Sequence, residues 1–100
     1  GIAAIVAASA GQLIGASFHR AETLQYQTHL ISAVEELWVH RQRHGVFPAT
    51  VQGRDDAQLT LASCGEHCVA VRLEPIKPHV CGYWELTTAG ERSAGSPGCW

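Results

Sequence analysis

Residues 1–44 read GIAAIVAASAGQLIGASFHRAETLQYQTHLISAVEELWVHRQRH, and they contain no proline. A stretch of this kind can form one continuous helix, which would be roughly 65 Å long at ~1.5 Å per residue. Gly45 and Pro48 follow directly, and both residue types favour the end of a helix. A globular domain of this chain length is much narrower than such a helix. Part of the helix must therefore serve something outside its own domain.

The first part of the predicted helix carries no charge. Residues 1–18 consist of Gly, Ala, Ser, Ile, Val, Leu and Phe with a single Gln12. The segment is near the lower limit of a membrane span and only weakly hydrophobic. Small residues at helical spacing suit close helix packing, and they are Gly1, Ala4, Ala8, Gly11 and Gly15. We expect membrane insertion or packing against other helices; a poorly ordered leader or a fragment of something longer is the alternative.

The second part, residues 21–44, is amphipathic. Apolar residues recur at intervals of three, four and seven, which predicts a buried stripe made of Leu24, Leu30, Ile31, Ala33, Val34, Leu37 and Trp38. The acidic and amide side chains fall largely off this stripe, at Glu22, Gln25, Glu35 and Glu36. We expect the stripe to pack against a β-sheet.

The rest of the chain reads as a loop over residues 46–57 followed by strands. Residues 58–62 and 69–73 alternate with period two and flank a hairpin loop, and a third strand is expected over about residues 80–87. Its candidate inward face carries Val80, Trp84 and Leu86, and a polar tail begins at Ala89. The predicted class is α+β, with a long N-terminal helix packed against a small three- to four-stranded antiparallel sheet.

Composition restricts the function classes. The chain has 100 residues, 46% of them hydrophobic, and a net charge of −2, so overall charge does not indicate nucleic acid or an anionic surface. No catalytic Ser/His/Asp spacing, phosphate-binding glycine loop or His-Glu metal motif is found. We therefore expect no enzyme activity, no cofactor and no small-molecule substrate.

Four cysteines in so short a chain suggest disulfides and an oxidising compartment. Three pairings are possible, and the sequence alone does not choose among them. The prediction is pairing between neighbours, Cys64 with Cys68 and Cys81 with Cys99, because it requires no crossing of the expected sheet. The less favoured interpretation is a zinc site built from Cys64, His67, Cys68, His79 and Cys81, whose spacing differs from that of usual zinc sites.

A small group of cations lies near the predicted helix end. Arg41 and Arg43 follow Trp38, and Arg54 lies in the next loop, which makes these three arginines the candidate DNA contacts. The alternative is that the cations near residue 44 simply complement the helix dipole.

Three stretches together resemble the type IV pilins, most closely the minor pilins and pseudopilins. Residues 1–8 (GIAAIVAA) are similar to the second half of the pilin membrane segment. Residues 20–38 and the HGVFP run at 44–48 are similar to the family's helix end and its aromatic-proline exit. Residues 81–90 (CGYWELTTAG) with the terminal Cys99 and Trp100 resemble its last strands and closing disulfide.

The resemblance implies a structural minor subunit of a type IV pilus. Residues 1–18 would be the incomplete membrane and filament-core segment, and residues 19–100 the globular head with its two disulfides. Partners would be other pilin subunits, contacted through N-terminal helices, with apolar contacts from Ile2, Ile5, Val6 and Leu13. The subunit would lie in the bacterial inner membrane with a periplasmic head, and then in the extracellular pilus. A DNA-binding minor pilin for DNA uptake and a pseudopilin of type II secretion are the alternatives.

The chain departs from the family pattern at its start. Mature pilins normally begin with a methylated phenylalanine and carry a glutamate a few residues later, and neither is present here. We therefore expect an upstream segment to be missing, so processing and methylation are inferences about a longer parent chain. Ser9 also occupies a position where many major pilins have a helix-bending proline.

Overall fold

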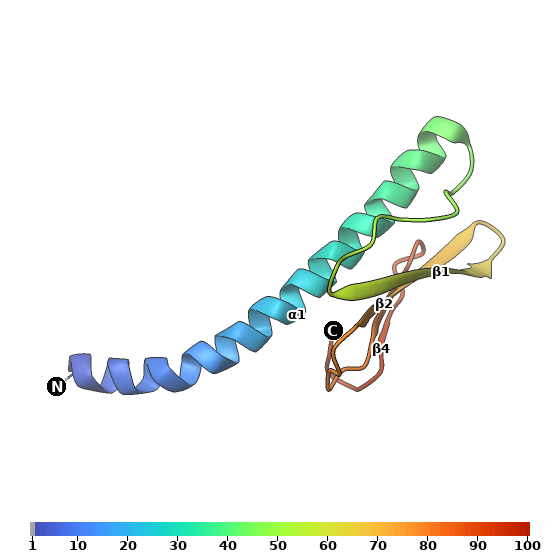
Figure 1. The fold of residues 1–100 in the computed structure, drawn as a ribbon. Helices are drawn as coiled ribbons and strands as arrows, with labels where there is room; N and C mark the ends of the chain where they lie inside the picture. The colour runs from blue at the N-terminus through green and yellow to red at the C-terminus, as the bar shows by residue number, and fades with distance from the viewer. Residues whose placement is uncertain (1) are drawn as a thin grey trace.

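A computed structural model describes residues 2–100, with side-chain surroundings from Arg20 onward. One long helix precedes four strands (Figure 1), and the elements are α1 (Ile2–His44), β1 (Ala57–Gly65), β2 (Cys68–Pro75), β3 (Trp84–Thr87) and β4 (Arg92–Ala94). The molecule is elongated, with extents of 62 × 25 × 24 Å. The C-terminal half of α1 lies against the sheet, and the N-terminal turns continue beyond it (Figure 1). The predicted α+β class and the single long helix are confirmed.

The sheet is a simple antiparallel meander in the order β1-β2-β3-β4. Leu59 pairs with Leu73, and Val71 pairs with Leu86, so apolar residues meet across neighbouring strands. Strand β4 pairs with β3 and lies in the stretch predicted to be a polar tail. Its sequence, Arg92–Ala94, has no apolar alternation that would identify a strand, and its position comes from pairing with β3.

The core lies between α1 and the inner face of the sheet. Alternate residues of β2 and β3 point toward the helix, because successive side chains of a strand lie on opposite faces. The fully buried large side chains are Trp84, Leu30, Leu37, Leu73 and Val71. One line of helix residues supplies the other half of the core, and it comprises Tyr26, Leu30, Ala33, Val34 and Leu37.

The predicted helix stripe was partly wrong. Leu24 is 59% exposed, Ile31 39% and Trp38 40%, whereas Tyr26 is only 3% exposed. The sheet is narrow, so it covers only one line of α1 residues. This line consists of Tyr26, Leu30, Ala33 and Leu37. Tyr26 tolerates burial because its hydroxyl donates a hydrogen bond to Glu22 at 3.1 Å.

The predicted third strand begins too early in the chain. Val80 is 85% exposed, and the chain turns at Gly82, whose φ is 73° and whose N–H donates to the His79 carbonyl at 2.9 Å. Strand β3 therefore starts only at Trp84. Val80 does not share a buried face with Trp84 and Leu86, and that part of the prediction was wrong.

The helix ends as its sequence predicts. Gly45 has a φ of 80°, and its N–H donates to the Arg41 carbonyl at 2.7 Å. A positive φ is easily adopted only by glycine, so Gly45 both ends α1 and satisfies one of its last carbonyl groups.

Candidate functional site

The N-terminal part of α1 is the predicted assembly segment. Ile2, Ile5, Val6 and Leu13 all lie within α1, but their side-chain surroundings lie outside the described residues. Within the part of the chain that the structure describes, no helix combines the length and apolar character needed to cross a membrane.

The half of α1 that belongs to the head has two different sides. Leu24, Ile31 and Trp38 are seven residues apart, so they lie almost in line along the helix. This line borders the core-facing line that includes Leu30 and Leu37, because successive helix residues are about 100° apart around the axis. The head therefore presents a row of partly exposed apolar side chains along α1, which can contact another molecule.

The three candidate DNA-contacting arginines do not form one track. The Arg41 guanidinium lies 5.5 Å from the Trp38 ring centroid and 4.9 Å from that of Phe47. Arg54 instead lies over Tyr26, 5.4 Å from its centroid. Tyr26 and Arg41 are fifteen residues apart on α1, roughly 22 Å at the helical rise.

Arg54 is also engaged by a carboxylate. Its Nε donates to Asp56 Oδ1 at 2.7 Å and its Nη2 donates to Oδ2 at 3.0 Å. This hydrogen bonding holds the pKa of Asp56 below its usual value and raises that of Arg54. Much of the Arg54 charge is therefore offset, whereas Arg43 lies on the exposed face of the last helical turns.

Both predicted disulfides are present, Cys64–Cys68 and Cys81–Cys99. The first closes the exposed turn between β1 and β2. His67, inside that turn, has a φ of 68°. Because all four cysteines are disulfide-bonded, none is a free thiolate, and the alternative zinc site built on them is excluded.

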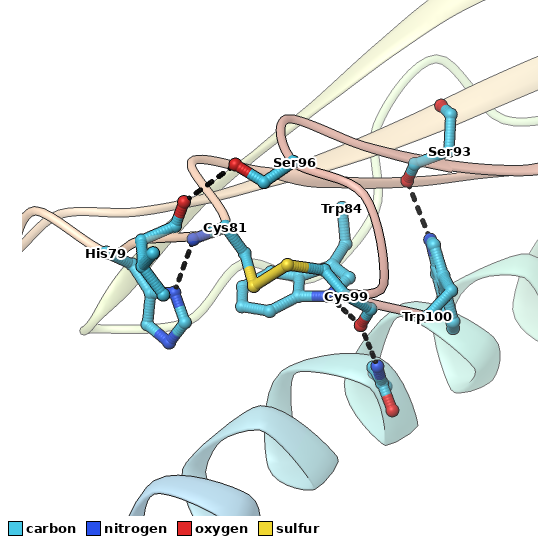
Figure 2. The surroundings of a disulfide bond; sticks show 9 residues. His79, Cys81, Trp84, Ser93, Ser96, Cys99 and Trp100 are labelled. Atoms are coloured by element: carbon cyan, nitrogen blue, oxygen red, sulfur yellow. Dashed lines mark hydrogen bonds between the residues drawn. A yellow bond between two sulfur atoms is a disulfide. The ribbon is translucent and has the colours of Figure 1, made fainter.

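The Cys81–Cys99 bridge joins the C-terminal loop to the turn that precedes β3 (Figure 2). The Cys99 carbonyl oxygen accepts two hydrogen bonds, one from Trp84 Nε1 at 2.9 Å and one from Gln27 Nε2 at 2.7 Å. One backbone oxygen thus connects the helix, the sheet and the disulfide loop.

The same loop is held by further polar contacts (Figure 2). His79 Nδ1 accepts from the Cys81 N–H at 3.0 Å, and Ser96 donates to the Val80 carbonyl at 2.9 Å. The indole of Trp100 donates to the Ser93 carbonyl at 2.6 Å. These contacts fix the last residues on the head.

Sequence reasoning missed two residues that organise this region, Tyr26 and Gln27. Tyr26 packs on Trp84 with ring centroids 5.5 Å apart. The spacing of Tyr26, Leu30, Ala33 and Leu37 carried a helical signal that could have identified it. Gln27 bonds to a residue 72 positions away, and nothing local in the sequence indicates that partner.

Among the described residues, no three His, Cys, Asp or Glu side chains come together in an arrangement that would hold a metal ion. The pKa of Tyr26 is raised for structural reasons: burial has the largest effect, and the hydrogen bond to Glu22 adds to it.

These features define a class of fold: one long helix, half of it packed on a four-stranded antiparallel meander whose C-terminal loop is closed by a disulfide. A solved structure of a type IV pilin from Shewanella oneidensis shares this fold with a TM-score of 0.63 and 19% sequence identity, covering 80% of this chain and 94% of that chain. Comparison with protein-family models and with curated proteins gives no match. The chain therefore has the type IV pilin fold.

Proposed function

We propose that this protein is a structural minor subunit of a type IV pilus. The observation that carries the proposal is the single helix α1, which forms half of the head core and then continues beyond the head. The similarity in fold to a solved type IV pilin supports it. A helix of this design can hold a subunit in a bundle while its head stays outside that bundle.

In this proposal, residues 1–18 are part of the assembly segment and residues 19–100 are the head. The segment lies in the inner membrane before assembly, with the head in the periplasm, and in the filament core afterwards. Ile2, Ile5, Val6 and Leu13 make apolar contacts with neighbouring subunits. The disulfide-bonded head lies on the surface of the extracellular filament.

Filament composition tests the proposal. The protein is produced from its own gene in its source bacterium, and sheared filaments are purified and probed for it. We expect the wild-type head in the filaments at a low ratio to the most abundant subunit, and its loss from them in Ile5→Asp and Leu13→Asp. Glu66→Gln, on the exposed turn between β1 and β2, is the matched control and should leave incorporation unchanged.

Two results would contradict this function. One is absence of the wild-type protein from purified pili; the other is normal incorporation of Ile5→Asp. Loss of protein secretion with intact pili after gene deletion would instead indicate a pseudopilin of type II secretion.

One observation favours DNA binding as a second candidate function. The Arg41 guanidinium lies over the rings of both Trp38 and Phe47, and Arg43 is in the same last turns of α1. Cations interleaved with aromatic rings suit nucleic acid, because phosphates pair with guanidinium groups and bases stack on rings. The offset charge of Arg54 weakens its part in such a surface.

A gel-shift with short DNA at low salt tests this candidate. We expect Arg43→Gln and Arg41→Gln each to weaken binding and to reduce its salt dependence, because each removes a phosphate contact. Arg92→Gln, on the far strand β4, is the control. Equal binding by all variants, or no binding by the wild type, would reject DNA contact at this surface.

A further inference from the structure

Two histidines lie one helical turn apart at the end of α1. His40 and His44 are four residues apart, and their ring centroids are 4.4 Å apart with an angle of 42° between the planes. Side chains at this spacing are neighbours on the same helix face. Helical histidines four residues apart are a known way to present two nitrogen ligands to one metal ion.

A hydrogen bond leaves one ring nitrogen of His40 available. His40 Nδ1 lies 2.9 Å from the Val46 carbonyl oxygen, which is only an acceptor, so Nδ1 carries the proton and donates it. In the neutral ring the free lone pair is then on Nε2. Metal-binding histidines almost always have this arrangement, in which the non-ligating nitrogen donates to a carbonyl or carboxylate.

The electrostatic surroundings favour a cation. The two histidines lie on an open surface of α1, near Glu36 and Arg43. The charges of Glu36 and Arg43 offset each other when the histidines are neutral. The negative end of the α1 dipole is here, and it attracts positive charge.

The nearest additional positive charge is directed elsewhere. Arg41, between the two histidines in sequence, places its guanidinium over the rings of Trp38 and Phe47. It is thereby held against aromatic surface, which reduces its repulsion of an ion placed between the two imidazoles.

We propose that His40 and His44 form a binding site for a divalent transition metal ion such as Zn²⁺ or Ni²⁺. Nε2 of His40 is one ligand, a ring nitrogen of His44 is the second, and water molecules complete the coordination shell. Imidazole nitrogen suits these ions, and not Mg²⁺ or Ca²⁺, which prefer oxygen. With two protein ligands the site binds more weakly than a four-ligand structural site and is reversible. The proposal does not depend on the pilus function.

Calorimetric titration with the metal ions alone tests the site. We expect Zn²⁺ and Ni²⁺ to bind the wild-type chain with one-to-one stoichiometry, and binding to weaken at least about tenfold in His40→Ala and in His44→Ala. His67→Ala, on the exposed turn between β1 and β2, is the matched control and should bind like the wild type. Circular dichroism on each variant confirms that the helix is retained. Equal binding by the wild type and both helix variants, or binding lost only in His67→Ala, would overturn the proposal.

Nitrogen NMR provides a second readout that a nonspecific surface interaction would not give. On addition of Zn²⁺, the Nε2 resonance of His40 should shift to the metal-bound position while Nδ1 stays protonated. A shift of Nδ1 instead, or of the His29 or His67 nitrogens with His40 unchanged, would contradict the assignment.

Discussion

Leu24 and Tyr26 are two residues apart on α1, yet their surroundings are opposite. Leu24 is 59% exposed, whereas Tyr26 is 3% exposed and packs on Trp84. Hydrophobicity alone would bury Leu24 first, but the position of the narrow sheet selects Tyr26. The direction of each helical side chain relative to the sheet therefore governs its contribution to stability.

Substitution at two adjacent helix positions tests this directly. Leu30 is fully buried and Ile31 is 39% exposed. We expect Leu30→Ala to lower the free energy of unfolding by about 2–5 kcal/mol, because it removes buried surface and leaves a cavity. Ile31→Ala should cost less than about 1 kcal/mol, since the side chain is partly in water and alanine favours the helix. Urea unfolding measures both, and equal losses would contradict the assigned core.

The Tyr26 hydroxyl predicts how stability changes at alkaline pH. Burial and the Glu22 hydrogen bond raise the pKa of Tyr26 in the folded state, so the unfolded chain loses this proton first. The stabilisation that the protonated Tyr26 hydroxyl gives the folded state is fully present below about pH 10, the pKa of tyrosine in the unfolded chain. It is lost as the pH rises through the higher pKa of Tyr26 in the folded state.

Urea unfolding of the wild type and of Tyr26→Phe above pH 9 checks this. The Phe variant should be less stable at neutral pH by about 1 kcal/mol, because one hydrogen bond is lost. Its stability should fall less steeply with rising pH. Parallel pH profiles for the two proteins would show that Tyr26 does not titrate as argued.

Among the elements, the end of α1 is defined by one residue. Gly45 has a φ of 80°, and a Cβ added there would meet nothing within 4 Å. Gly53 is equally open but has no positive φ. Gly45→Ala should therefore cost about 1–2 kcal/mol from backbone strain alone. Gly53→Ala should be neutral or stabilising by up to about 1 kcal/mol, and thermal unfolding compares the pair. A neutral Gly45→Ala would mean that the helix can end without a left-handed residue.

The two disulfides should differ in their effect on stability. Cys81–Cys99 spans 18 positions and Cys64–Cys68 spans 4, and a longer closed loop restricts the unfolded chain more. We expect replacing Cys81 and Cys99 with serine to lower the free energy of unfolding by about 3 kcal/mol, and replacing Cys64 and Cys68 to lower it by about 2 kcal/mol. Denaturant unfolding of the two double variants measures this, and a larger loss for the short loop would contradict it.

Elements with a local signal could be predicted from sequence, and elements set by distant partners could not. The continuity of α1 follows from the absence of proline and its end from Gly45, and the expected hairpin between β1 and β2 favoured pairing of Cys64 with Cys68. Strand β4 has no local pattern because its pairing with β3 defines it. The Gln27 bond to Cys99 likewise depends on the folded arrangement, as does the Asp56 partner of Arg54.

The molecule as a whole divides into a head and a helical extension. Side-chain burial is described from Arg20 onward, and the first buried residue is Tyr26. Residues 20–25 therefore contribute no buried side chain to the core. A fragment of residues 19–100 should therefore fold with both disulfides, unfold cooperatively, and have a midpoint temperature within a few degrees of the full chain. Calorimetry checks this, and loss of a cooperative transition would show that the head needs residues 1–18.

The Cys99 carbonyl has a mechanical consequence for such a molecule. Tension along α1 would act as a shear force on all the contacts between the helix and the sheet at once. Gln27 is the residue on α1 that is hydrogen-bonded to the Cys99 carbonyl. The Cys81–Cys99 bond and Trp84 hold the same carbonyl on the sheet side. We therefore expect a pull on the helix to reach the sheet through a covalently supported point, so that reduction of this disulfide would lower the force at which the head detaches from its helix.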